Sequence, residues 1–183
     1  TGADMGHQPA PNWPGFIDVW TPINPNLKLA GRLGMARDAN GKIISADCIV
    51  LLPGLCGGNN VIRQQNLAEA LKNSGLHVLA IETRAQGQTA VGYPNVPSTW
   101  GICESSDLLI VSDWLTAKPN IKRTGLIGFS WGGTIAMLTA WSEERSGGHP
   151  GVAPQIERIL PKLPPRRRYQ AGIMAFSPVL DLD

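Results

Sequence analysis

A serine set between glycines is the feature of this sequence that most constrains its fold. Ser130 lies in the segment Gly-Leu-Ile-Gly-Phe-Ser-Trp-Gly-Gly, residues 125–133, with a short apolar run before it and a mostly apolar stretch, residues 134–141, after it. Gly128 and Gly132 stand two positions before and after the serine, where a strand and a helix would approach too closely for a Cβ atom. The segment therefore predicts a strand, a tight turn and a helix, with the Ser130 hydroxyl held clear of the backbone.

The composition is typical of one compact globular domain. The chain has 183 residues, of which 43% are hydrophobic and 16% are charged, and this length suffices for a hydrophobic core. A net charge of +2 gives no case for nucleic-acid binding. The one basic cluster, residues 166–168 beside Lys162, lies among prolines, so we expect a solvated connection rather than a phosphate-binding patch. No apolar run approaches the roughly 18 residues of a membrane span, and none is predicted.

The cysteines indicate neither a metal site nor a disulfide framework. Cys48, Cys56 and Cys103 are odd in number, and no pair of them has the Cys-x-x-Cys spacing. Reduced thiols in an intracellular compartment are the simpler interpretation. No metal ion and no organic cofactor is implied by the residues of this chain.

Apolar runs alternate with amphipathic segments along the chain. The run at residues 48–52, which ends at Pro53 and Gly54, is typical of a strand buried on both faces of a parallel sheet. The predicted strands are residues 16–20, 27–37, 48–52, 76–82, 124–129 and 171–176, and the predicted helices are residues 59–74, 104–117, 134–144 and 155–160. This alternation of βαβ units predicts an α/β fold, with a mainly parallel sheet and helices on both faces.

The remaining segments are expected to be irregular. Residues 1–15 are predicted to form an N-terminal arm, and residues 16–183 a single, partial domain. Asn40 and Gly41 form the dipeptide that favours a hairpin turn after the second strand. Residues 84–101 are predicted to be a loop, and residues 146–168 an excursion broken by prolines and glycines.

Four stretches together resemble the serine esterase and lipase branch of the α/β-hydrolase superfamily. Residues 51–58 are similar to its oxyanion loop, and residues 82–89 to its Asp-x-Arg-Gly-x-Gly-x-Ser turn. Residues 104–107, which lead into residues 113–115, are similar to its helix before the nucleophile, and the Ser130 segment is similar to its nucleophile elbow. The resemblance covers about residues 28–180, and the chain looks like the N-terminal two-thirds of such an enzyme.

The resemblance implies a chemical role for three of these residues. Ser130 would be the nucleophile, although a serine that merely fills a small space in a tight turn is the alternative. The family's oxyanion hole uses two backbone N–H groups, which fall here on Leu55 and Trp131. Pro53 stands where the family often has histidine, a departure that leaves the amide geometry plausible because only backbone is required.

Other conspicuous residues are expected to be structural. Cys56 lies close to the oxyanion loop but has no neighbouring histidine, so we interpret it as a buried structural thiol. Arg84 is expected to pack and hydrogen-bond within its own turn. The aromatic residues Trp100, Trp131 and Phe176 could line an acyl pocket, but we interpret them as core.

The histidines do not complete a triad in the family's order of nucleophile, acid and histidine. His7 lies in the predicted arm, and His77 opens a strand at the sheet end away from the expected active site. His149 follows Ser130 soon after the predicted helix, before the last predicted strand. Asp181, which follows that last strand, is the candidate acid, because some lipases of this superfamily place their acid there.

The predicted function is hydrolysis of a small-molecule carboxylic ester through an acyl-enzyme on Ser130, with a base from beyond the end of the chain. The last predicted strand would form an apolar sheet edge, so we expect a companion segment or a protein partner to cover it. Three interpretations stay open: the N-terminal part of a larger hydrolase, a non-catalytic subunit of an assembly, and a minimal hydrolase that uses His149 as its base.

Overall fold

The computed structural model describes residues 12–55, 57–59, 61–143 and 153–179. Most of the predicted arm, residues 1–11, lies outside the described residues, as do Cys56, His149 and Asp181. The elements in chain order are β1 (Phe16–Asn24), β2 (Leu27–Gly34), β3 (Ala46–Leu52), α1 (Ile62–Asn73), β4 (His77–Ile81), α2 (Gly87–Gly92), α3 (Ile102–Thr116), β5 (Ile121–Phe129), α4 (Trp131–Glu143), α5 (Pro154–Ile159) and β6 (Ile173–Phe176).

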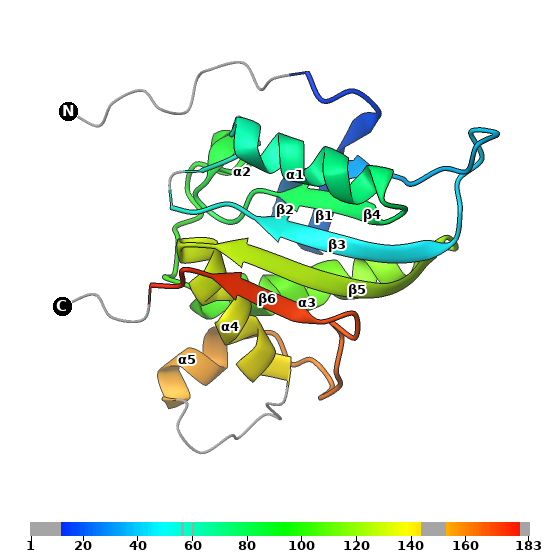
Figure 1. The fold of residues 1–183 in the computed structure, drawn as a ribbon. Helices are drawn as coiled ribbons and strands as arrows, with labels where there is room; N and C mark the ends of the chain where they lie inside the picture. Colours follow the sequence, from blue (N-terminus) through cyan, green and yellow to red (C-terminus); the bar gives the residue numbers. More distant parts are fainter. Residues whose placement is uncertain (1–11, 56, 60, 144–152, 180–183) are drawn as a thin grey trace.

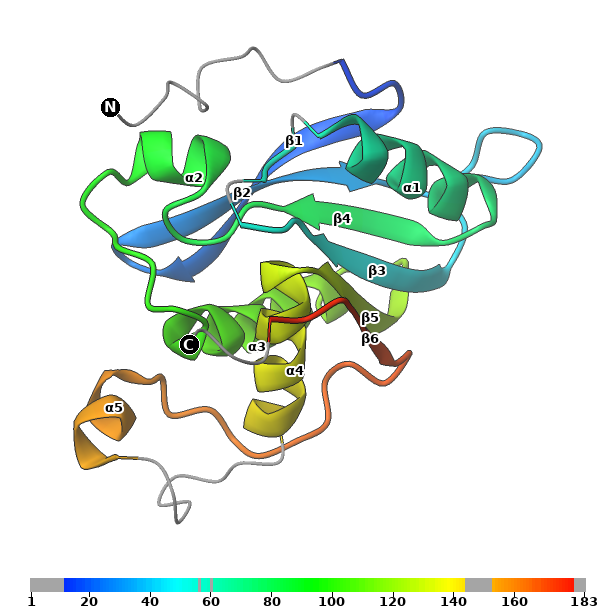
Figure 2. The ribbon, with the colours of Figure 1, turned by 60° about the vertical axis from the view of Figure 1, so that its left-hand side comes forward.

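The six strands form one sheet in the order β1-β2-β4-β3-β5-β6. β4, β3, β5 and β6 pair in parallel, whereas β2 pairs antiparallel with both β1 and β4. Helix α1 covers one face of the sheet, and α3 and α4 cover the other (Figures 1 and 2). The predicted α/β fold with a mainly parallel sheet is therefore confirmed.

The central strands are apolar on both faces because both faces are covered. On β4, Leu79 and Ile81 join the core between the sheet and the α3–α4 layer, whereas Val78 and Ala80 join the core beneath α1. Successive side chains of a strand point to opposite faces. A strand between two helical layers is therefore apolar at consecutive positions, and such runs were the pattern from which the buried strands were predicted.

The prediction of a hairpin at Asn40 and Gly41 is wrong, because the turn there does not join two neighbouring strands of the sheet. β2 ends at Gly34, and the turn is closed by a single bridge between Arg37 and Ile43. β4 lies between β2 and β3 in the sheet, so β2 and β3 are not neighbours. The actual hairpin joins β1 to β2, with Asn24 and Leu27 as its last paired residues.

Helix α2 lies within the segment that we expected to be a loop. It has only six residues and a glycine at each end, too short a stretch to show helical periodicity. Tertiary contacts hold it: the N–H of Gln88 donates to the Glu82 carboxylate over 2.7 Å, and the Thr89 hydroxyl donates to the Glu82 carbonyl over 2.7 Å.

The basic cluster is not simply a solvated connection. Arg166 and Arg167 are exposed, but the side chain of Arg168 is only 2% exposed. Its Nε donates to Asp113 over 2.9 Å, and its backbone N–H donates to Glu143 over 2.7 Å. This arginine therefore ties the segment before β6 to α3 and α4.

Candidate active site

Ser130 connects β5 to α4 in a left-handed backbone conformation. Its φ is +51°, and the residue is exposed. Its N–H donates to the Phe176 carbonyl of β6 over 2.8 Å, while its own carbonyl accepts the N–H groups of Gly133 and Thr134 over 2.8 and 3.1 Å. The predicted strand, turn and helix around this serine are confirmed.

The flanking glycines are required by close backbone contact. A Cβ atom at Gly128 would overlap the carbonyl of Gly132, and one at Gly132 would overlap the Pro53 carbonyl. A Cβ at Gly54 would lie 3.3 Å from the Cβ of Ser130. The segment after β3 therefore lies directly against the turn that carries Ser130.

Two backbone N–H groups, those of Trp131 and Leu55, belong to the segments that meet at this serine and donate to no acceptor among the described residues. Trp131 opens α4, where the first N–H groups of a helix have no intrahelical partner. Leu55 follows Gly54 in the segment after β3. Among the residues that the structure describes, no hydrogen-bond acceptor receives the N–H of either residue.

Glu82 joins the segments on either side of this site. The residue is 3% exposed, and its carboxylate accepts the N–H of Asn59 and that of Gln88, each over 2.7 Å. Burial raises the pKa of Glu82, and the backbone hydrogen bonds to it oppose that shift. A Cβ at Gly87, whose φ is +47°, would overlap the same carboxylate. Residues 82–89 were singled out only by their resemblance to a family turn. The link that Glu82 makes between Asn59 and Gln88 depends on tertiary contacts, which the sequence does not predict.

Gln86 adds a second link to the segment after β3. Its Nε2 donates to the Gly54 carbonyl over 3.3 Å, and its Oε1 accepts the Thr83 hydroxyl over 2.8 Å. Gly54 precedes Leu55, so this contact helps to fix the direction of the Leu55 N–H. No sequence pattern singled out this glutamine.

We expected Arg84 to hydrogen-bond within its own turn, but it pairs instead with Asp107 of α3. Its Nε and Nη2 donate to the two carboxylate oxygens over 2.5 and 2.9 Å. Burial raises the pKa of Asp107 to about 6, and the bonds from Arg84 limit that rise. Arg84 follows β4, so the pair fixes α3 beneath the carboxyl edge of the sheet.

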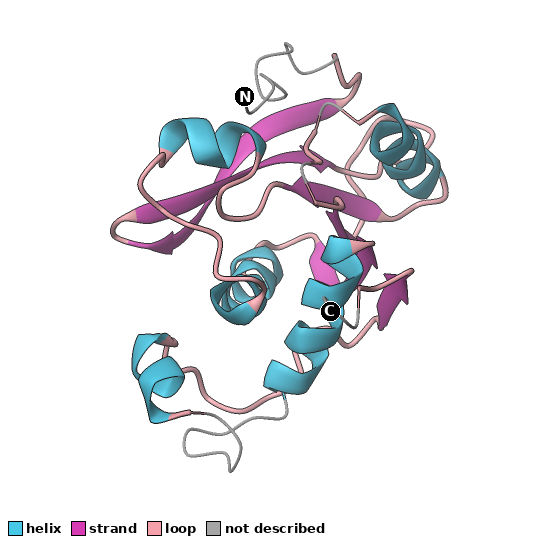
Figure 3. Cartoon of the chain, turned by 90° about the vertical axis from the view of Figure 1, so that its left-hand side faces the viewer, coloured by secondary structure: helices cyan, strands magenta, loops and turns pink. Residues whose placement is uncertain are grey.

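Three exposed apolar side chains come from segments that contact the Ser130 turn. Trp100 is 59% exposed, Leu55 is 57% exposed and Phe176 is 43% exposed. Trp100 packs edge-on against Trp131 with ring centroids 5.5 Å apart, and Phe176 stacks on Phe129 at 5.1 Å. Trp131 is core, as expected, but the interpretation of Trp100 and Phe176 as core is wrong, because neither side chain is covered. Figure 3 views the molecule from this edge of the sheet.

The sequence model of a family described as alpha/beta hydrolase fold matches residues 47–142, just over half of the chain. The chain belongs to the α/β-hydrolase family. The match spans β3 to α4 and therefore includes the segment after β3 and the Ser130 turn. No curated protein gives a significant match.

Solved structures of this fold match the α/β-hydrolase chain over most of its length. The Pyrococcus furiosus esterase Pf2001 is 25% identical, with a TM-score of 0.54, and the match covers 71% of this chain and 47% of that one. XC6422 from Xanthomonas campestris, described as an a/b serine hydrolase without lid, is 18% identical, with a TM-score of 0.57 and coverages of 74% and 59%. The dienelactone hydrolase from Anabaena variabilis is 22% identical, with a TM-score of 0.55 and coverages of 72% and 59%. The chain thus spans well under two thirds of the length of these structures.

The histidine that the structure describes lies far from Ser130. His77 opens β4, at the edge of the sheet opposite the carboxyl ends of the parallel strands, as predicted. Its Nδ1 accepts the N–H of Ala36, and its Nε2 lies 2.9 Å from the Asn120 carbonyl. The side chain is fully buried and serves the packing of this edge. His7, His149 and the candidate acid Asp181 lie outside the described residues.

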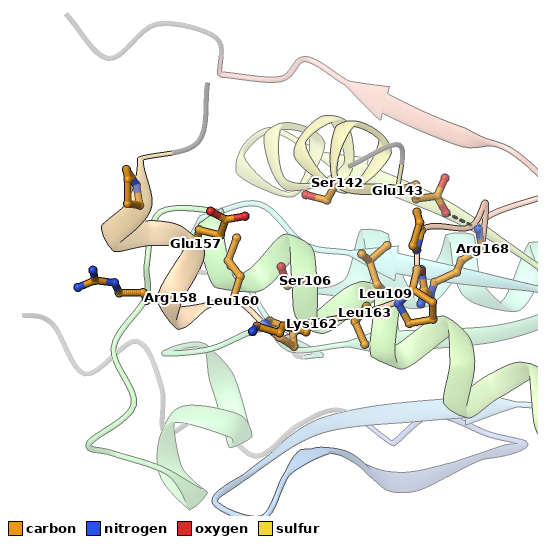
Figure 4. A pocket seen from close by; sticks show the side chains of 14 residues that line it. Ser106, Leu109, Ser142, Glu143, Glu157, Arg158, Leu160, Lys162, Leu163 and Arg168 are labelled. Atoms are coloured by element: carbon orange, nitrogen blue, oxygen red, sulfur yellow. Dashed lines mark hydrogen bonds between the residues drawn. The ribbon is translucent and has the colours of Figure 1, made fainter. Parts of the chain in front are cut away.

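A cavity of about 510 Å³ lies at the other end of α4 (Figure 4). Ser106 and Leu109 of α3 line it together with Ser142 and Glu143 of α4, and the segment around α5 closes its far side. Ser142 follows Trp131 by eleven residues of helix, or about 16 Å. The cavity is therefore separate from the Ser130 turn.

Two further properties concern only the part of the chain that the structure describes. No group of three or more His, Cys, Asp or Glu side chains there is arranged to hold a metal ion. No helix there has both the length and the apolar character that crossing a membrane requires.

Proposed function

We propose that this chain carries the nucleophile of a serine hydrolase that acts on small-molecule carboxylic esters. The observation that carries the proposal is the position of Ser130, exposed on a left-handed turn between β5 and α4, with the segment that leads to Leu55 packed against it. The similarity to an esterase from Pyrococcus furiosus at 25% identity agrees with this reaction class.

The reaction follows from this arrangement in two steps. The Ser130 Oγ attacks the ester carbonyl carbon while a general base takes its proton, and the negative charge develops on the carbonyl oxygen. The alcohol then leaves with a proton, and an acyl group remains on Ser130. Water attacks this acyl-enzyme, aided by the same base, and releases the carboxylic acid.

The N–H groups of Leu55 and Trp131 would form the oxyanion hole. Each donor of this kind contributes about 2.7–4 kcal/mol to lowering the barrier in serine hydrolases. The N-terminus of α4 adds favourable partial positive charge, because the peptide dipoles of its 13 residues are aligned. The links from Glu82 and Gln86 would hold the Leu55 segment in place as the charge develops.

The base and the acid would come from residues outside the described ones. Asp181 remains the proposed acid, and we infer that a companion segment of the same or another chain supplies the histidine. β6 pairs with β5, and among the described residues no strand pairs with its other edge. Met174 of β6 is 53% exposed, and an open apolar edge is a template for another strand.

The same open edge also supports a second candidate, a non-catalytic subunit that docks on a partner through β6. In that case the companion would bring no histidine to Ser130. A structure of the full-length gene product with any copurifying partner separates the two, because only the hydrolase places an imidazole beside the Ser130 hydroxyl.

A serine-directed fluorophosphonate probe tests the proposed reaction in the full-length gene product. We expect one modified residue, Ser130, located by peptide mass mapping, and no labelling of Ser130→Ala. Ser177→Ala is the matched control, because Ser177 is also exposed, has a φ of +47° and follows a strand. Labelling of another serine, or none in the folded protein together with any copurifying partner, would refute the proposal.

A further inference from the structure

We propose that Trp100 is a specificity-determining residue that holds an uncharged aromatic group of the ester against an apolar rim. The apolar rim consists of Leu55, Trp100 and Phe176. The inference rests on the proposed function, because it takes Ser130 as the reacting group. It adds the chemical class of the substrate to that proposal.

Each rim residue is tied to Ser130 by a direct contact of its own segment. The backbone of Gly54, next to Leu55, lies against the Ser130 side chain. The Phe176 carbonyl accepts the Ser130 N–H over 2.8 Å. The Trp100 ring packs against Trp131, the residue after the serine. Three segments distant in sequence therefore meet at the Ser130 turn, and each carries one large, exposed apolar side chain.

The exposure of Trp100 is built into its loop. Its φ is +55°, a conformation that is uncommon for residues other than glycine. The residues on either side of it are fixed by Glu104, whose carboxylate accepts the N–H groups of Thr99 and Gly101 and the hydroxyls of Ser98 and Thr99. Glu104 is itself only 1% exposed. A buried network thus holds an exposed indole in a defined place.

The charged groups around the rim are already engaged. Arg84 is paired with Asp107, the Glu82 carboxylate accepts two backbone N–H groups, and Glu104 accepts four hydrogen bonds. Among the described residues, the rim therefore offers apolar surface and aromatic rings rather than a free charge. Such a surface favours a neutral substrate group over a carboxylate or an ammonium group.

An aromatic group fits this rim better than an aliphatic one of equal size. Trp100 meets Trp131 edge-on, at an interplanar angle of 76°, and more than half of its surface remains open. An aryl ring can add to this arrangement in an offset or edge-to-face geometry. Such pairs strengthen binding beyond the burial of area, by a factor of about 2 to 13.

Binding of two matched esters tests the inference without any turnover. Ethyl benzoate and ethyl cyclohexanecarboxylate are titrated into the Ser130→Ala chain, and backbone amide shifts in NMR spectra give each dissociation constant. We expect the benzoate ester to bind about 2- to 13-fold more tightly, with the largest shifts at Leu55, Trp100 and Phe176. Trp100→Ala should remove this preference, and Trp100→Phe should retain part of it.

Trp20→Ala is the control, because Trp20 is also exposed and packs edge-on against Tyr93, but on β1 at the far side of the sheet. It should keep the preference. If Trp100→Ala fails to fold, Trp100→Leu keeps the apolar bulk without the ring and gives the same comparison. Equal binding of the two esters, or an unchanged preference in a folded Trp100 variant, would overturn the inference.

The result is separable from the proposed hydrolysis. Fluorophosphonate labelling of Ser130 without an aryl preference would leave the proposed function standing and overturn the role of Trp100. An aryl preference that depends on Trp100, without any labelling of Ser130, would support the apolar rim as a binding site and refute the hydrolase.

Discussion

Replacing Gly128 by alanine should destabilise the protein far more than the loss of a flexible residue explains. A Cβ at Gly128 would overlap the carbonyl oxygen and carbon of Gly132 and lie 2.8 Å from the Gly133 nitrogen. All three obstacles are backbone, so no side chain can turn away. Overpacking of this kind costs about 1–3 kcal/mol where side chains can adjust, and we expect about 3 kcal/mol or more here.

The assay is thermal unfolding of the purified chain, followed by circular dichroism. For a domain of this size, 1 kcal/mol shifts Tm by about 2–4 °C, so Gly128→Ala should lower Tm by about 6–12 °C. Gly41→Ala is the matched control: Gly41 has a φ of +78° but nothing within 4 Å of a built Cβ, so only backbone strain of about 1–2 kcal/mol applies. If Gly128→Ala lowers Tm no more than Gly41→Ala, the close approach of β5 and α4 is not as described.

Three further perturbations have defined outcomes. Glu82→Gln places an amide NH₂ group against one of the two backbone N–H groups, of Asn59 or Gln88, that the carboxylate accepts. It should therefore lower the free energy of unfolding by about 1–3 kcal/mol, measured by urea titration. An unchanged midpoint would contradict the role of Glu82 as a link between the two segments. The folded carboxyl of Asp107 binds its proton more tightly than the unfolded one, so its contribution to stability, up to about 3 kcal/mol, should be lost as pH rises from about 4 to 6. In urea titrations at several pH values, Asp107→Asn should remove this loss of unfolding free energy between about pH 4 and about pH 6. If the wild type instead gains stability relative to Asp107→Asn over this range, the raised pKa of Asp107 is refuted. The 183-residue chain alone should hydrolyse p-nitrophenyl esters only about 10³–10⁴-fold faster than water does, whereas robust turnover abolished by both Ser130→Ala and His149→Ala would identify a complete enzyme.

The sequence predicted best where covalent geometry and burial act locally. The glycines around Ser130 predicted the turn because no other residue fits where β5 meets α4. The apolar runs predicted β3, β4 and β5 because both faces of these strands are covered. The βαβ pattern predicted that these strands pair in parallel, which is confirmed, but their order in the sheet, with β3 between β4 and β5, comes from the structure.

The failures depend on contacts between distant residues. Arg84 pairs with Asp107 across 23 positions, and no local pattern distinguishes that from a hydrogen bond within its turn. Helix α2 is too short to show a period and depends on Glu82. Trp100 appeared as core because its residue type is apolar, whereas its left-handed backbone and the Glu104 network leave it exposed.

The most direct measurement of the central claim is the mass of the full-length gene product during reaction with a p-nitrophenyl ester. The reaction is quenched in acid within the first turnovers, and the masses of the intact protein and of its peptides are measured by mass spectrometry. The account predicts one added acyl group, located on Ser130, absent in Ser130→Ala and retained in Ser177→Ala. Release of p-nitrophenol with no acyl group on Ser130, or with the acyl group on another residue, would contradict it.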